Sequence, residues 1–222
     1  MKKYYEAYDD RYKQVHDKGL AWSPNNNTTI VEEVINKLNL KSKKILEIGC
    51  GEGRDARYLL NKGYDVVAGD ISEEAIKYCK ENDPIHSEKY KVSNVLKEEP
   101  TDKFDFIYSV ACLHMFVPDE DRNKFFKYIH GSLEDDGYSL ILSMGDGTKE
   151  SKSDITKAFD KTKRTHQETN TDILVTTTSC RIVSFETLTK EAEKNGFTVV
   201  EQGLTEIENH FNKIMYIIIK KH

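Results

Sequence analysis

Three glycines and two acidic residues have the types and the spacing of a nucleoside-binding site. Gly49, Gly51 and Gly53 follow Glu47 closely, and Asp70 stands 21 residues after Gly49. Closely spaced glycines leave backbone N–H groups open to a ligand, and a helix that follows them adds the positive end of its dipole. A carboxylate at the end of the next strand can accept hydrogen bonds from both hydroxyls of a ribose. The pattern predicts a bound nucleoside, with Glu47 facing a cationic group.

The same stretch argues against a nicotinamide dinucleotide. Such a turn reads G-x-G-x-x-G, with glycine or alanine at position 54, where this chain has Arg54. Glu47 also places a negative charge where a pyrophosphate would lie. Two alternatives stay open at this point: a nicotinamide-dependent Rossmann reductase and a non-catalytic nucleoside-binding module.

Alternating strands and helices are predicted to position these residues. Short apolar runs that stop at turn residues are typical of buried strands, and apolar residues three to four apart are typical of helices. Strands are expected at 45–48, 65–68, 90–92, 104–110, 138–142, 197–202 and 214–219. Helices are expected at about 28–39, at 54–61, from about 73, and at 119–130 and 185–194. This order predicts a doubly wound α/β fold: a mostly parallel seven-stranded sheet with an antiparallel C-terminal edge and helices on both faces.

Local signals refine the ends of several helices. Thr29 and Glu32 have the spacing of a capping box, and Ser72 is the expected N-cap of the helix that begins near 73. Gly63 is the expected C-cap of the 54–61 helix, and Pro118 suits the start of the 119–130 helix.

The chain is expected to form one domain over 1–222, with two additions. Residues 1–26 are polar and aromatic and predict an N-terminal arm, a helix followed by a loop. The polar segment 144–179 breaks the rhythm of strand and helix and is the predicted acceptor-site insertion. Its residues 149–164 hold six basic and three acidic side chains, which would favour an anionic acceptor, although a charge run is usually a solvated face.

Composition limits the partners. The net charge of -5 has the wrong sign for broad attraction to nucleic acid or anionic lipid, so neither is an expected partner. The four cysteines are widely spaced, which predicts reduced thiols rather than a metal site or a disulfide framework. No apolar run is long enough to span a bilayer, and the expected location is cytoplasmic. The sequence does not distinguish a monomer from a dimer.

The stretch from Ile45 to Asp55 resembles the first motif of class I S-adenosylmethionine-dependent methyltransferases, two apolar residues around an acid followed by G-x-G-x-G. The strand at 104–110, its tail at 111–116 and Gly137 also look like that family. The Tyr-rich arm and the run 63–67 resemble its thiopurine and tellurite-resistance branch. The resemblance implies a Rossmann-like fold, S-adenosyl-L-methionine as the cofactor, and methyl transfer to a small-molecule acceptor: a thiol, hydroxyl, amine or metalloid oxyanion.

The resemblance also assigns roles to residues. It places the glycine loop under the methionine part of the cofactor, Asp70 on the ribose, and Asn94 at the adenine, where the family usually has Asp. Ile71 and Val95 would then enclose the base. The residues expected to bind cofactor are Glu47, Gly49, Cys50, Gly51, Gly53, Arg54, Asp70, Ile71, Asn94, Val95, Ser109 and Val110, with Tyr12 and Trp22 of the arm closing over it.

His114 is the candidate general base, because the end of the fourth strand faces the transferring methyl group in this family. A hydroxyl acceptor needs such a base, whereas an acceptor that loses its proton beforehand does not. The alternative is that His114 only shapes the pocket. For Tyr12 and Trp22 the alternative is that they pin the arm to the core. Cys50 is better explained by its small size than by a reactive role.

Overall fold

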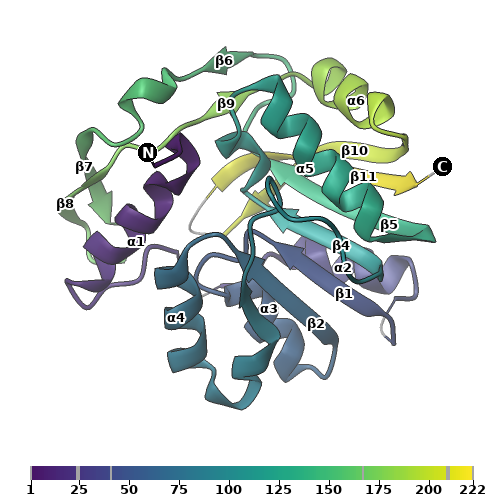
Figure 1. Ribbon diagram of the computed structural model, residues 1–222, viewed down its shortest axis with the longest axis horizontal. Helices are drawn as coiled ribbons and strands as arrows, with labels where there is room; N and C mark the ends of the chain where they lie inside the picture. The colour runs from purple at the N-terminus through teal and green to yellow at the C-terminus, as the bar shows by residue number, and fades with distance from the viewer. Residues whose placement is uncertain (1, 24–25, 41, 167, 209–210, 222) are drawn as a thin grey trace.

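The computed structural model describes residues 2–23, 26–40, 42–166, 168–208 and 211–221. Residues 1, 24 and 25 of the predicted arm and residue 167 of the predicted insertion lie outside the described residues. The seven main strands form one sheet in the order β10-β11-β5-β4-β1-β2-β3 (Figure 1). Their bounds are β1 Lys44–Ile48, β2 Asp65–Asp70, β3 Tyr90–Val92, β4 Phe104–Val110, β5 Leu133–Ser143, β10 Phe197–Ile207 and β11 Phe211–Lys221.

The order of the strands places the glycine loop at the middle of the sheet. β3, β2, β1, β4 and β5 run parallel, whereas β11 pairs with β5 and with β10 in antiparallel fashion. The chain builds outward from β1 to β3 and then returns to β4 on the other side of β1. Ligands bind at such a switch point, beyond the carboxyl ends of the strands. The predicted sheet is confirmed, and β5, β10 and β11 are longer than predicted.

Helices cover both faces of the sheet. Apolar side chains of α2 (Thr29–Lys37), α3 (Arg54–Asn61) and α4 (Glu73–Asn82) belong to the core on one face. Those of α5 (Asp119–Ser132) and α6 (Phe185–Lys194) belong to the core on the other. Among the described residues, no helix has both the length and the apolar character that a membrane span requires.

The arm and the insertion pack against each other beside the sheet. The arm holds η1 (Tyr4–Glu6) and α1 (Ala7–His16), as the helix prediction required. The insertion, which was predicted only as a polar break, contains β6 (Ser151–Lys152), η4 (Ile155–Lys157) and the hairpin of β7 (Lys161–His166) and β8 (Thr171–Thr176). β9 (Arg181–Ile182) then pairs with β6. α1 lies along β8, and both stand beyond the sheet in Figure 1.

The predicted caps are mostly confirmed. Ser72 Oγ accepts a hydrogen bond from the backbone N–H of Ala75 at 3.0 Å, and Gly63 follows α3 with φ +85°. The capping box at Thr29 is wrong, because Thr28 occupies the N-cap position of α2. The carboxylate of Glu32 instead accepts hydrogen bonds from side chains of α3 and the loop after it, so that it ties α2 to α3.

Candidate functional site

A cavity of about 670 Å³ opens at the carboxyl ends of the central strands. This volume is within the range of small-molecule sites, roughly 300–1,000 Å³. Apart from Gly53 and Ser109, every predicted site residue lines it. The predicted residues that line it are Tyr12, Trp22, Glu47, Gly49, Cys50, Gly51, Arg54, Asp70, Ile71, Asn94, Val95, Val110 and His114.

The glycines of the loop are required by backbone conformation and by packing as well. All three have positive φ, which side-chain-bearing residues rarely adopt. A Cβ atom on Gly49 would lie 2.6 Å from Cys112 Sγ, and one on Gly51 would lie 2.6 Å from Tyr12 Oη. One on Gly53 would lie 2.7 Å from Cys79 Sγ of α4. Gly53 is therefore needed for the close packing of α4 and does not line the cavity. Gly51 leaves room for the hydroxyl of Tyr12 from the arm.

Glu47 is a buried acid at the inner end of the cavity, with 2% of its surface exposed. The parallel register sets Glu47 opposite Tyr108 of β4, and Tyr108 Oη donates a hydrogen bond to Glu47 Oε2 at 3.0 Å. Burial raises the pKa of Glu47 well above its usual value, and the nearby charge of Arg54 offsets part of this rise. No local signal pointed to Tyr108, because its contact with Glu47 depends on the pairing of two strands and joins residues 61 apart in the chain.

Arg54 supplies a buried cation close to Glu47. Its Nη2 donates to Thr28 Oγ1 at 3.0 Å, and its Nε lies 3.4 Å from Asp55 Oδ2. Its Nη1 is buried without a hydrogen-bond partner among the described residues. Buried donors are nearly always paired, so this atom fits a ligand acceptor. A carboxylate from Glu47 and a free guanidinium N–H from Arg54 suit the ammonium and carboxylate of an amino-acid group.

Asp70 braces the glycine loop. Its Oδ2 accepts a hydrogen bond from the backbone N–H of Gly51 at 2.8 Å, and its Oδ1 accepts one from that of Ser72 at 2.9 Å. Burial raises its pKa, and these two donors counter the rise. Each carboxylate oxygen has a second lone pair, so Asp70 can hold the loop and still accept ribose hydroxyls.

The end of the cavity beyond β2 and β3 is suited to a flat apolar ring. Ile71 and Val95 line it, as does Asn94. Asn94 Oδ1 already accepts the backbone N–H of Leu96 at 3.1 Å, and Glu98 Oε1 accepts that of Asn94 at 2.8 Å. The amide oxygen of Asn94 thus has one lone pair left for an adenine amino group, and Glu98 is a lining residue that the sequence analysis missed.

Ser109 and the cysteines near the glycine loop are buried side chains that contribute to packing. Ser109 is fully buried, and its Oγ donates to the carbonyl of Ile48 at 2.9 Å, so that it joins β4 to β1 outside the cavity. A hydrogen bond with Cys79 and burial raise the pKa of the Cys50 thiol. Burial raises that of Cys112 to about 12. A thiol with so high a pKa is a poor nucleophile at neutral pH.

His114 lies on a short turn, η3 (Leu113–Met115), and lines the cavity with 4% of its surface exposed. Three side chains, one from α5, one from β9 and one from the segment between β8 and β9, hold the carbonyl groups around it. Arg122 Nη1 donates to the carbonyl of Leu113 at 3.0 Å, and Ser179 Oγ donates to that of Met115 at 2.8 Å. Arg181 Nη1 donates to the carbonyl of Val117 at 2.9 Å. These three hydrogen bonds therefore hold the segment from Leu113 to Val117 in place through residues that lie outside it.

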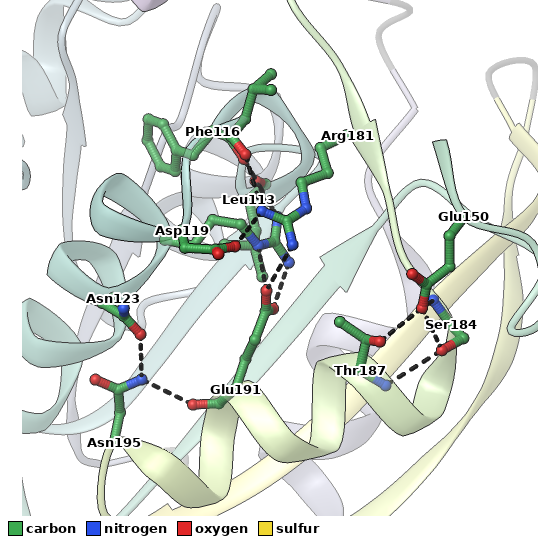
Figure 2. A network of polar contacts seen from close by, with 12 residues as sticks. Leu113, Phe116, Asp119, Asn123, Glu150, Arg181, Ser184, Thr187, Glu191 and Asn195 are labelled. Carbon is green, nitrogen blue, oxygen red and sulfur yellow. Dashed lines mark hydrogen bonds and ion pairs between the residues drawn. The ribbon is translucent and has the colours of Figure 1, made fainter. Parts of the chain in front are cut away.

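An ion pair completes this support. Nε and Nη2 of Arg122 donate to Oε1 and Oε2 of Glu191 at 2.7 and 2.6 Å. Arg181 Nη2 lies 3.9 Å from the same carboxylate. Figure 2 shows Glu191 reaching from α6 toward Arg181 and the Leu113–Phe116 turn. The Glu191 carboxylate thus connects α6 to α5 and β9 next to the turn that carries His114.

The arm covers the glycine loop through Glu52, a residue that the sequence analysis did not select. Its two carboxylate oxygens accept the backbone N–H groups of Trp22 and Ser23, each at 2.6 Å. His16 Nε2 lies 2.8 Å from Glu52 Oε1, and its Nδ1 lies 3.0 Å from Glu74 Oε1 of α4. Trp22 and Tyr12 are therefore both anchored to the loop and exposed to the cavity.

The insertion forms the remaining wall. It contributes Ser153, Arg164, Thr165, His166, Thr177, Thr178 and Ser179. Arg11 of α1 also lines the cavity, and its Nε and Nη2 donate to the carbonyl of Thr176 at 2.9 and 2.7 Å. The sequence signals for this wall were the break in the rhythm of strand and helix at 144–179 and the basic run within it. Nothing in the sequence pairs Arg11 with a strand 165 residues away.

Comparisons with known proteins agree with this geometry. The sequence matches the family model described as Methyltransferase domain over residues 24–202. The probable S-adenosyl-L-methionine-dependent methyltransferase TehB of Haemophilus influenzae is 32% identical over 124 residues, which are 53% of this chain and 42% of that protein. Phosphoethanolamine N-methyltransferase 3 of Arabidopsis thaliana is 31% identical over 137 residues, 59% of this chain and 27% of that protein. The chain thus spans less than half the length of these two relatives.

Solved structures show the same fold. The 1,6-didemethyltoxoflavin-N1-methyltransferase of Burkholderia thailandensis, solved with 1,6-didemethyltoxoflavin and S-adenosylhomocysteine, has a TM-score of 0.72 at 18% identity and covers 100% of this chain and 91% of its own. The CcbJ methyltransferase of Streptomyces caelestis has a TM-score of 0.69 at 15% identity, with 97% and 98% covered. The chain therefore belongs to the methyltransferase-domain family.

Proposed function

We propose that this chain transfers a methyl group from S-adenosylmethionine to a small-molecule acceptor, with S-adenosylhomocysteine as the second product. The observation that carries the proposal is the inner end of the cavity, where the buried Glu47 carboxylate lies close to Arg54 Nη1, an atom with no hydrogen-bond partner among the described residues. This pair complements the ammonium and carboxylate of a methionine group, and a nicotinamide dinucleotide has neither. When bound, the cofactor supplies a methyl group on a positively charged sulfur, which is a good leaving group.

The residues of the chain would then act by holding and orienting. Asp70 accepts the ribose hydroxyls, and Ile71 and Val95 enclose the adenine. The arm, through Tyr12 and Trp22, covers the loop and excludes water, which favours the reaction of a weakly solvated acceptor. A nicotinamide-dependent reductase is disfavoured by Arg54 and by the match to the methyltransferase-domain family.

The acceptor would enter between β4 and the insertion. His114 lines this side, and we propose that it takes the proton of a hydroxyl acceptor or orients an acceptor that is already deprotonated. Residues 144–179 would supply the acceptor contacts within a single domain of 222 residues. A location in the cytoplasm remains a prediction from the sequence.

Calorimetric titration with S-adenosylhomocysteine tests the cofactor site. Arg54→Gln should weaken binding about tenfold or more, because a charge-assisted hydrogen bond to a carboxylate is lost in a buried place. Arg57→Gln is the matched control, since Arg57 lies on the same helix and does not line the cavity. Equal affinities of the two variants would contradict the role of Arg54.

An acceptor screen tests the activity itself. Production of S-adenosylhomocysteine is followed with thiols, phenols, amines, tellurite and selenite as candidate acceptors. Turnover with any of them separates an enzyme from a non-catalytic nucleoside-binding module. Tight cofactor binding without turnover across the whole screen would favour the binding module.

A further inference from the structure

The cavity contains a buried cation that forms no ion pair with an acidic side chain of the described residues. Arg11 is 5% exposed, and its guanidinium lies between the rings of Tyr8 and Trp22, 4.9 and 4.7 Å from their centroids. Its Nε and Nη2 donate to backbone carbonyls of Thr176 and Thr177. Among the described residues, no carboxylate oxygen lies within 4.0 Å of it. Burial, which removes the guanidinium from water, lowers the pKa of Arg11.

A second guanidinium stands near the first. Arg164 of β7 lines the same cavity from its exposed rim, and its charge acts on Arg11 in the direction of repulsion. In the part of the chain that the structure describes, Arg164 also forms no ion pair. Two like charges that face one cavity without a counter-ion are unfavourable, and an anion between them would relieve the repulsion.

The surroundings of this pair suit an anion as well. The hydroxyl group of Thr178 belongs to the same wall and can donate a hydrogen bond to an oxygen atom of a ligand. Those of Thr165, Thr177 and Ser179 also line the wall, but they donate to Asp172, Asp160 and Met115. The acids that line the cavity belong elsewhere: Glu47, Asp55 and Asp70 lie at the glycine loop and its helix, and Glu98 and Asp102 lie beyond β3. The positive charge is therefore concentrated on the acceptor side.

We propose that the acceptor carries an anionic group, a carboxylate or a similar oxyanion, and that Arg11 and Arg164 bind this group. The inference rests on the proposed function and narrows its substrate class. Arg11, which is fixed by the carbonyls and the two rings, sets the position of the anion. Arg164, at the rim, adds attraction as the anion enters. The part of the acceptor that receives the methyl group would lie deeper, toward His114.

Trp22 provides a direct readout, because it is the only tryptophan of the chain and contacts Arg11. Its fluorescence is titrated with 4-nitrobenzoate and with 4-nitrobenzamide, two quenchers of nearly equal shape that differ in charge. In protein saturated with S-adenosylhomocysteine, we expect the anion to quench at an at least fivefold lower concentration. Arg164→Gln should reduce this preference by about three- to fivefold, the range expected for one partly exposed charge contact.

Matched variants make the test decisive. Lys163→Gln removes one positive charge from the neighbouring position of β7, which does not line the cavity, and should keep the preference. Arg164→Lys should keep much of it. Equal quenching by the two probes, or equal loss in the Lys163 and Arg164 variants, would overturn the proposal.

The cofactor has a carboxylate of its own, so the source of the anion must be distinguished. If Arg11 and Arg164 bind the cofactor carboxylate, the preference will vanish when S-adenosylhomocysteine is added, and Arg164→Gln will weaken that ligand in calorimetry. Either result would overturn the acceptor assignment and leave the proposed function intact. Failure of wild-type protein to bind S-adenosylhomocysteine would instead refute the proposed function.

Discussion

Replacing Glu191 with Gln should destabilise the protein strongly, although the change removes no more than a charge and one acceptor. Arg122 is among the most completely buried side chains, at 1% exposure, and Glu191 is exposed by only 15%. Two of the three guanidinium nitrogens of Arg122 donate to this carboxylate. In the variant, one acceptor oxygen remains and the guanidinium keeps its charge without a counter-ion.

The magnitude follows from the geometry. Two unit charges about 4 Å apart attract by about 4 kcal/mol at an effective dielectric constant of 20. Removal of one partner from a buried pair typically costs 3–5 kcal/mol. The slight exposure of Glu191 reduces the effect, so we expect a loss of about 3 kcal/mol in the free energy of unfolding. For a chain of this size, that loss lowers the melting temperature by about 6–12 °C.

Urea unfolding and thermal denaturation measure this loss. Glu193→Gln is the control, because Glu193 is exposed on the same helix and should change stability by no more than about 0.5 kcal/mol. The network holds the carbonyls beside His114 and does not touch the cofactor end, so methyl transfer should slow while binding of S-adenosylhomocysteine persists. Equal melting temperatures for the two variants would refute the reasoning.

Three further predictions concern titratable groups. If His114 is a general base, His114→Asn should lower turnover and flatten the pH–rate profile, and unchanged turnover would exclude this role. Burial lowers the pKa of His16, but hydrogen bonds to Glu52 and Glu74 raise it by more, so its charged form stabilises the folded arm. This stabilisation is present below the unfolded pKa, about 6.5, and is lost as the pH rises through the higher folded pKa. Unfolding curves from about pH 6 to 9 should show it in wild type and not in His16→Gln. Because burial raises the pKa of Glu47, binding of a cationic ligand end should release a proton. Calorimetry in buffers of different ionisation enthalpy should therefore give different heats for wild type, and equal heats for Glu47→Gln.

Much of the central sheet could be predicted, because its signals are local. Buried parallel strands appear as short apolar runs, and glycines with positive φ mark the turn after β1. The N-cap at Ser72 depends on contacts within one helical turn. Thr28 and Thr29 show the limit of such signals. Either threonine could cap α2, and the choice depends on Asp55, whose carboxylate accepts the backbone N–H and the hydroxyl of Thr28.

The contacts that complete the site could not be predicted, because they join distant parts of the chain. The hairpin of β7 and β8 is mostly polar, so its alternation of buried and exposed residues is weak. The resemblance to the methyltransferase family placed Ser109 among the expected cofactor contacts, but Ser109 does not line the cavity. Successive side chains of a strand point to opposite faces of the sheet, so Val110 lines the cavity while Ser109, on the other face, donates to the carbonyl of Ile48.

The arm and the hairpin of the insertion support each other, and together they connect the glycine loop to the opposite wall of the cavity. The apolar cluster between them contains three buried residues, Val15, Ile173 and Val175, with Leu20 and Trp22 beside it. So small a cluster contributes only a few kcal/mol, less than the conformational entropy lost by either segment alone. The carbonyls bound by Arg11 and the ties from Glu52 to Trp22 and Ser23 supply the rest. Because Glu52 belongs to the glycine loop, these contacts connect the loop through the arm to the wall that the insertion forms.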